Sequence, residues 1–276
     1  MKRTTILIAV LVVAAVAVMA VMLLRREKIS PVYVGSSMRV PMEQCLDAYK
    51  KLHPDADIRL DFGDSGEVLS KVEFTGRGEA AVLHEPYITK AKRDGWGTKT
   101  HVLANMQPVI VVAKGNPKGV TGLKDFTRDD LHVGVTDARY TTSGQIVQQA
   151  LANAGIREQV MARDDLVQNR SSGYMCLQVE EDALDAITCW DAVARGRADR
   201  VDIVPIEPAF MPHSFIDSEV VTYTDGRVSV GLIELKTAQH PESTADFVRF
   251  ILSPEGQAIW AKCGFNPAVE SPASQP

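Results

Sequence analysis

The sequence predicts an α/β protein of two lobes, each built on a central, mostly parallel sheet with helices on its faces. Short apolar segments alternate with amphipathic ones along most of the chain, as in parallel sheets covered by helices. A length of 276 residues also exceeds what one core usually fills. Two turn-like stretches, "VVAKGNPKGVTGLKDF" and "VDIVPIEPAF", interrupt the pattern and predict crossings between lobes. We therefore expect lobe I to comprise residues 30–112 and 206–268, and lobe II residues 113–205.

The first element is an apolar run at the N-terminus. Lys2 and Arg3 precede 19 apolar residues, 6–24, and two arginines follow. That length is close to the roughly 20 residues that cross a bilayer and exceeds the roughly 7 to 15 of a signal-peptide core. Residues 1–29 are therefore interpreted as a signal anchor or signal peptide, with an uncleaved anchor favoured over cleavage after Ala20. The body would then lie in the periplasm or on the extracellular face, tethered to the cytoplasmic membrane by residues 6–24.

The remaining elements follow from apolar runs and helical periodicity. Strands are expected at Val32–Val34, Ile58–Phe62, Ala80–Leu83, Gln107–Ala113, His132–Thr136, Ala186–Trp190, Ile203–Pro205 and Val228–Leu235. Helices are expected at Pro41–Leu52, Glu67–Glu73, Gly144–Ala154, Tyr174–Glu181, and Thr244–Lys262 with a break at Pro254. Residues 269–276 predict a disordered tail.

Charge and cysteine content restrict the partners. Residues 1–30 hold five basic residues and one acidic residue, so the rest carries 25 basic and 34 acidic residues, a net charge of −9. That balance argues against nucleic acid as a partner. Four cysteines, Cys45, Cys176, Cys189 and Cys263, have no metal-site spacing, so no metal or cofactor is expected. Outside the cytoplasm they allow three disulfide pairings, although Cys45 and Cys189 fit the pattern of small core residues.

Three turns between a strand and a helix carry hydroxyl groups. They are "GSSMRVP" with Ser36 and Ser37, "DFGDSGEV" with Ser65, and "DARYTTSGQ" with Tyr140, Thr141, Thr142 and Ser143. A single hydroxyl at such a place usually caps the helix. Several hydroxyls at several turns also suit an oxyanion, because helix N-termini offer free N–H donors and partial positive charge. The turns lie beyond the carboxyl ends of strands, where open α/β sheets bind ligands.

Carboxylates beside these turns would oppose a dianion. Asp64, Asp137 and Asp191 are therefore expected to act as turn or cap residues that face solvent. An enzyme is not expected, because the chain lacks a GxSxG, HExxH or phosphate-loop motif.

The ordered set of motifs resembles the extracellular solute-binding proteins of ABC transporters, and most of all the molybdate-binding proteins. It runs from "VYVGSSMRVPMEQ" through "DFGDSGEVLSKV", "HVGVTDARYTTSGQ" and "DAITCWDAVAR" to "FVRFILSPEGQAIW", about residues 32–268. The resemblance implies a two-lobed type II periplasmic-binding fold that closes on a bare tetrahedral oxyanion. Position by position it implies ligand-binding roles for Ser36 or Ser37, Ser65, the backbone N–H of Thr142, the backbone near Ser172, and Trp190.

Two positions depart from that family. Trp190 stands where the molybdate binders usually have a tyrosine, and His84 with Glu85 replaces small residues followed by an aspartate. His84 is thus either a histidine at the edge of the cleft or a ligand contact whose charge near neutral pH alters the choice of anion.

These features together predict a binding protein that captures a tetrahedral oxyanion, molybdate or tungstate first, for an ABC importer. Its partners would be the anion, the ABC permease and, through the N-terminal helix, the membrane. The alternatives are sulfate, phosphate or phosphonate as ligand, or a membrane-tethered sensor or scaffold with the same fold.

Overall fold

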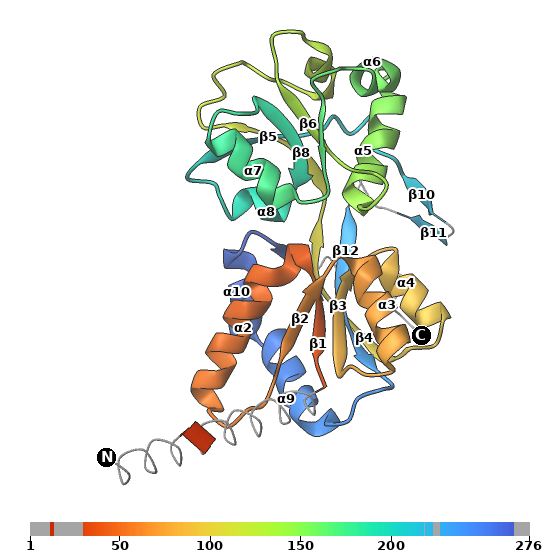
Figure 1. The fold of residues 1–276 in the computed structure, drawn as a ribbon, viewed down its shortest axis with the longest axis vertical. Helices are drawn as coiled ribbons and strands as arrows, with labels where there is room; N and C mark the ends of the chain where they lie inside the picture. Colours follow the sequence, from red (N-terminus) through yellow and green to blue (C-terminus); the bar gives the residue numbers. More distant parts are fainter. Residues whose placement is uncertain (1–11, 14–29, 218, 223–226, 268–276) are drawn as a thin grey trace.

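The computed structural model describes residues 12–13, 30–217, 219–222 and 227–267, and the described residues from 30 onward form two lobes, each around its own sheet (Figure 1). The expected membrane segment, apart from Val12 and Val13, and the expected tail at 269–276 lie outside the described residues. Within the described ranges, none of the helices has both the length and the apolar character that a membrane span requires.

Lobe I contains a six-stranded sheet. In spatial order its strands are β13 (Asn266–Pro267), β4 (Gly97–Met106), β12 (Val228–Leu235), β3 (Ala80–His84), β1 (Val32–Gly35) and β2 (Leu60–Gly63). Strands β1, β2 and β3 are parallel, with Val32 paired to both Leu60 and Ala80. Their carboxyl ends therefore meet at one edge of the sheet.

Lobe II contains a five-stranded sheet. Its strands are, in spatial order, β7 (Val167–Asn169), β6 (Val133–Thr136), β8 (Ala186–Trp190), β5 (Pro108–Ala113) and β9 (Val201–Val204). Here β6, β7 and β8 are the parallel strands. A separate hairpin pairs β10 (Ser214–Asp217) with β11 (Glu219–Thr222).

Both sheets are mixed, which corrects the expectation of mostly parallel sheets. In lobe I, β12 is antiparallel to β3 and β4, and β13 is antiparallel to β4. In lobe II, β5 is antiparallel to β8 and β9. The antiparallel strands β4, β5, β9 and β12 lie on either side of the two passages between the lobes. At these passages the chain continues into the next strand without a helix, whereas a parallel pair needs a long crossover connection, usually a helix.

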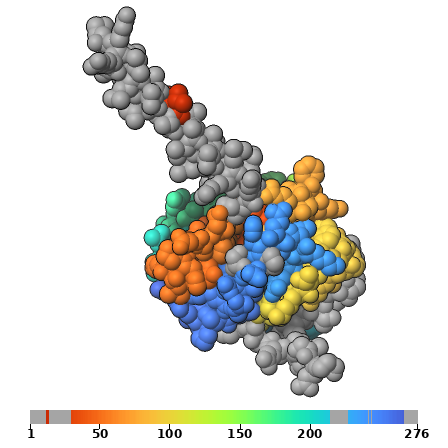
Figure 2. Space-filling view, turned by 90° about the horizontal axis from the view of Figure 1, so that it is seen from below, coloured from red at the N-terminus to blue at the C-terminus, as the bar shows by residue number. Residues whose placement is uncertain are grey.

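Helices cover both faces of each sheet. Around lobe I lie η1 (Ser36–Met38), α2 (Arg39–Leu52), α3 (Ser65–Thr75), α4 (Tyr87–Arg93), α9 (Pro241–Leu252) and α10 (Pro254–Lys262). Around lobe II lie η2 (Leu123–Thr127), α5 (Thr142–Asn153), α6 (Arg157–Met161), α7 (Ser172–Glu180) and α8 (Asp191–Arg195). Seen end-on in Figure 2, α2 (orange) packs beside the C-terminal helices (blue), so the two ends of the described chain close one face of lobe I.

The chain passes between the lobes at positions shifted from the expected ones. Strand β4 belongs to lobe I and β5 to lobe II, so the first passage is at Gln107 and not near residue 112. On the way back, Glu207 accepts a hydrogen bond from the backbone N–H of Leu123, and the carbonyl of Phe210 accepts one from Asn153. Residues 206–210 therefore still pack on lobe II, and the second passage comes later than residue 206.

Candidate ligand-binding site

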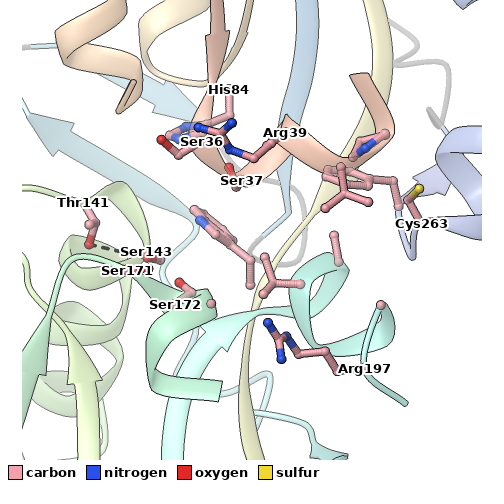
Figure 3. A pocket seen from close by; sticks show the side chains of 18 of the residues that line it. Ser36, Ser37, Arg39, His84, Thr141, Ser143, Ser171, Ser172, Arg197 and Cys263 are labelled. Atoms are coloured by element: carbon pink, nitrogen blue, oxygen red, sulfur yellow. Dashed lines mark hydrogen bonds between the residues drawn. The ribbon is translucent and has the colours of Figure 1, made fainter. Parts of the chain in front are cut away.

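A cleft of about 880 Å³ lies between the lobes. It is lined by the residues that follow the carboxyl ends of six parallel strands, β1, β2 and β3 from lobe I and β6, β7 and β8 from lobe II. This is the place where open α/β sheets bind ligands. All the residues expected to bind the ligand line it: Ser36, Ser37, Ser65, His84, Thr142, Ser143, Ser172 and Trp190. Figure 3 shows side chains from both lobes around the same space.

The hydroxyl groups of the first turn, in lobe I, do not cap a helix. Ser36 and Ser37 form the short helix η1 before α2, and neither helix has a side-chain cap. The Ser37 hydroxyl lies 3.1 Å from the sulfur of Met38, which is a weak acceptor. Gly35 allows this turn to approach the next one, because a Cβ there would lie 3.0 Å from Ser65 Oγ.

The second turn buries a hydroxyl that has no partner. Ser65 is the first residue of α3 and is only 4% exposed. Its Oγ is buried and makes no hydrogen bond within the protein. Such a group usually has a partner in a native structure, so its lack of one needs an explanation. A bound anion at this end of the cleft would supply the missing acceptor.

In the third turn one hydroxyl caps the helix and the hydroxyl of the next residue does not. Thr141 caps α5, because its side chain accepts a hydrogen bond of 3.0 Å from the N–H of Gly144. Its neighbour Thr142 is 2% exposed, and Thr142 Oγ1 is buried without a partner. The N–H groups of Thr142 and Ser143 stand in the first turn of α5, where the helix itself offers no acceptor. Ser143 Oγ lies 3.5 Å from Thr141 Oγ1. The cap is therefore Thr141, and the predicted Thr142 and Ser143 are left to face the cleft.

A fourth turn repeats that arrangement at α7. Ser171 is the cap and accepts a hydrogen bond of 3.2 Å from the N–H of Tyr174, while Ser172 begins the helix and is 9% exposed. The predicted residue Ser172 is thus again the position next to the cap.

His84 and Trp190 face each other from the two lobes. Their ring centroids are 5.6 Å apart, and Tyr87 meets His84 edge-on at 5.6 Å. Burial lowers the pKa of His84 from 6.5 to about 4, so the ring is neutral near pH 7 and the expected charge effect at neutral pH is absent. His84 Nδ1 lies 2.9 Å from the carbonyl oxygen of Glu85, which can only accept. Nδ1 therefore carries the hydrogen, and Nε2 keeps a lone pair. The Glu85 carboxylate accepts a hydrogen bond from the N–H of Thr89 in α4.

The three carboxylates beside the turns are compensated by arginines. Asp137 and Asp191 are 5% and 0% exposed, so the expectation that they face solvent is wrong. Arg139 donates to both carboxylate oxygens of Asp137 and holds the pKa of that group below its usual value. Arg195 lies 2.8 Å from Asp191. Asp64 is the most open of the three and pairs with Arg170 of the other lobe.

Sequence reasoning missed the cationic residues of the cleft. Five cations and only two carboxylates, Asp64 and Asp199, line it, in a body whose net charge is −9. The cations are Arg39, Arg170, Arg197, Arg200 and Lys262. They come from four separate segments, since Arg197 and Arg200 share the turn between α8 and β9, and no local pattern in the sequence links the four. The lining therefore carries more cations than carboxylates inside an acidic protein, and an anion in the cleft would compete for these cations with their present partners, among them Glu43 and Glu180.

Comparison with solved structures identifies the fold. The structure resembles the periplasmic molybdate-binding protein of Azotobacter vinelandii with a TM-score of 0.70 and 14% identity, over 87% of this chain and 100% of that one. It resembles iron-bound HitA from Pseudomonas aeruginosa with a TM-score of 0.65 and 14% identity, over 90% of each chain. For the sulfate-binding protein of Mycobacterium tuberculosis the TM-score is 0.62 and the identity 15%, over 87% of each chain. At such identities the likeness shows a periplasmic-binding fold, and the three named ligands differ.

Sequence comparison gives the family. No curated protein sequence matches the chain. The model of the family described as bacterial extracellular solute-binding protein matches residues 31–266, nearly the whole body. With its two sheets, the hydroxyl-bearing turns at their carboxyl ends and the cleft between them, the chain belongs to the bacterial extracellular solute-binding proteins.

Proposed function

We propose that this solute-binding protein captures a tetrahedral oxyanion, molybdate or tungstate, for an ABC importer and performs no chemistry on it. The observation that carries the proposal is the pair of buried hydroxyls without partners, Ser65 Oγ in lobe I and Thr142 Oγ1 in lobe II. Both line one cleft that has more cations than carboxylates. Hydrogen bonds to an ionised acceptor are about twice as strong as neutral ones, so a bound anion would offset the free-energy cost of burying these hydroxyls.

Binding would proceed by replacing the hydration shell of the anion. The turns of lobe I provide Ser36, Ser37 and Ser65, and closure of the lobes brings up the donors at the start of α5 and α7. The helix N-termini add partial positive charge without a cation at the centre of the site. The loaded protein would then hand the anion to the permease. In this proposal the N-terminal apolar run, residues 6–24, holds the body at the outer face of the cytoplasmic membrane.

A second ligand class, hydrogen phosphate or a phosphonate, is favoured by one specific observation. Fully ionised molybdate, tungstate and sulfate only accept hydrogen bonds, so they need donors alone. The lone pair on His84 Nε2 is an acceptor in the cleft wall, and a protonated anion would satisfy it. The choice between the two classes therefore depends on whether the bound anion carries a proton.

Calorimetric titration of the purified chain with molybdate, tungstate, sulfate and phosphate tests the proposal. We expect molybdate or tungstate to bind most tightly and to raise the melting temperature by several degrees, through mass action on the folded state. Tighter binding of phosphate would indicate that the ligand is an anion that carries a proton. If none of the four anions gives heat or a thermal shift, the oxyanion proposal is wrong.

A further inference from the structure

Two cysteines in lobe II lie in contact with each other beneath the cleft. Cys176 is on α7 and Cys189 is on β8, against which α7 packs. Both side chains are 0% exposed, and the two sulfur atoms are 3.5 Å apart. The distance is that of two thiols in a weak hydrogen bond, and it exceeds the length of a disulfide bond, about 2.05 Å, by roughly 1.5 Å.

The other two cysteines provide an internal comparison in lobe I. Cys45 lies in α2 and its sulfur is 4.0 Å from the carbonyl oxygen of Gly256. Burial raises the pKa of the Cys45 thiol to about 12, so its reactive thiolate form is strongly disfavoured. Among the described residues, Cys176 and Cys189 form the only thiol pair joined by a hydrogen bond.

We propose that Cys176 and Cys189 form a disulfide when the protein folds outside the cytoplasm, by exchange with a dithiol–disulfide oxidoreductase. This proposal is independent of the ligand, since it rests on contact geometry and on the extracellular family of the chain. Disulfides persist in such oxidising compartments.

The exchange begins when the thiol of one of the two cysteines, written here as Cys176, loses its proton. The Cys176 thiolate attacks one sulfur of the oxidant's disulfide and releases the other as a thiolate. Cys189 then loses its proton and attacks Cys176 in the mixed disulfide, which breaks the bond to the oxidant. Two electrons and two protons pass to the oxidant, which leaves as a dithiol. Because both sulfurs are buried in the folded lobe, the exchange takes place before α7 has docked on β8.

The cross-link would join two walls of the binding site. Helix α7 begins at Ser172, and β8 ends at Trp190, which directly follows Cys189; both residues line the cleft. A bond between positions 176 and 189 therefore fixes the N-terminus of α7 relative to the strand end that carries Trp190.

Peptide mapping of the exported full-length protein tests the bond. Residues 171–195 contain no lysine or arginine before Arg195, so trypsin releases both cysteines on one peptide. After alkylation without reduction, we expect this peptide unalkylated and lighter by two hydrogen atoms than its fully reduced form. A second cleavage after Glu180 or Glu181 should leave two fragments that separate only on reduction. Alkylation of both cysteines without reduction, or a bond that involves Cys45 or Cys263, would overturn the proposal.

Thermal unfolding gives a second measurement that does not depend on peptides. A bond that closes a loop of this size constrains the unfolded chain, so reduction should lower the melting temperature by roughly 5 °C or more. The Cys176→Ala/Cys189→Ala double variant should be insensitive to reductant, and Cys45→Ala, the matched control, should keep the full shift. If the double variant does not fold, the comparison of wild type and Cys45→Ala remains, and a wild-type protein unaffected by reductant contradicts the bond.

Discussion

Asp64 Oδ2 in lobe I and Arg170 Nη1 in lobe II lie 3.9 Å apart across the cleft. Asp64 directly precedes α3 but makes no side-chain cap to it, and Arg170 directly precedes the cap of α7. The pair thus joins the approaches to two of the helix N-termini that face the proposed ligand. An anion in the cleft would compete with Asp64 for the guanidinium group.

Removal of the Asp64 charge should therefore strengthen anion binding. Asp64→Asn takes away a like charge that lies near the proposed anion and leaves Arg170 available to the ligand. We expect the Kd for molybdate to fall by roughly three- to tenfold at low salt, and the gain to shrink as salt screens exposed charges. Calorimetry at two ionic strengths measures this. Asp55→Asn, the same charge change at an exposed loop outside the cleft, should leave the Kd unchanged; weaker binding by Asp64→Asn would contradict the prediction.

Ser65 provides the sharpest test of the buried hydroxyls. Its Oγ has no protein partner, so Ser65→Ala removes a ligand donor without breaking a bond in the free protein. Molybdate affinity should fall by about 1 to 3 kcal/mol, while the melting temperature without ligand stays equal or rises. The matched control is Ser70→Ala on the same helix, where the hydroxyl donates to the carbonyl of Gly66 and lies outside the cleft. Equal affinity in both variants would exclude a direct role for Ser65.

Substitution of Thr141 should mainly affect stability, and substitution of Thr142 should mainly affect ligand binding. Thr141 caps α5, so Thr141→Val should cost about 1 kcal/mol of unfolding free energy. Thr142→Val keeps the side-chain shape and removes a hydroxyl that has no partner, so we expect weaker molybdate binding at nearly unchanged stability. Chemical denaturation and calorimetry on both variants measure the two effects. The opposite pattern, with the stability loss at Thr142, would contradict the assignment of the cap.

The sequence located the hydroxyl-bearing turns because each one is a local pattern, a short apolar strand followed by Gly, Ser or Thr and a helix. It did not locate β4, since the first half of Gly97–Met106 is largely polar and exposed while the second half is buried. That strand runs almost directly into β5, so the lobe passage at Gln107 was hidden inside one apolar stretch. The cations of the cleft were missed for a different reason. Only tertiary packing brings Arg39, Arg197 and Lys262 to the wall of the same cleft.

His84 should make the protein less stable in mild acid. Its pKa is lowered by burial from 6.5 in the unfolded chain to about 4 in the folded one. Between these values the unfolded state binds the proton and the folded state does not, so stability is complete above about pH 6.5 and is lost as the pH falls toward 4. The full loss is about 3 kcal/mol.

Denaturant unfolding between pH 4 and pH 7.5 measures that loss. His84→Gln should flatten the decline, and His132→Gln, at an exposed position outside the cleft, should retain the wild-type slope. An unchanged slope in His84→Gln would show that other groups cause the decline.

Asp191 should be the most sensitive carboxylate of the molecule, because it ties the lobes together at the first passage. Its side chain is 0% exposed and accepts hydrogen bonds from the N–H of Gln107 at 2.9 Å, the N–H of Ala192 at 2.8 Å and the Asn266 amide at 3.0 Å. Asn266 belongs to β13 of lobe I, and Arg195, the ion-pair partner of Asp191, donates to the carbonyl of Gly264 in the same region. One carboxylate thus connects lobe II, the passage and the C-terminal part of lobe I.

Asp191→Asn keeps the shape but replaces an acceptor oxygen by an amide that donates, so at least one of these N–H groups loses its partner and Arg195 loses its counter-charge. We expect a loss of about 3 kcal/mol of unfolding free energy, since removing one partner of a buried pair leaves the other uncompensated. Asp199→Asn, the same change at an exposed cleft residue, should cost less than about 0.5 kcal/mol. Arg195→Gln should fall between the two, because the arginine side chain is 36% exposed and water can replace part of its pairing. A loss at Asp191 no larger than that at Asp199 would mean that the lobes are held at the passage by packing alone.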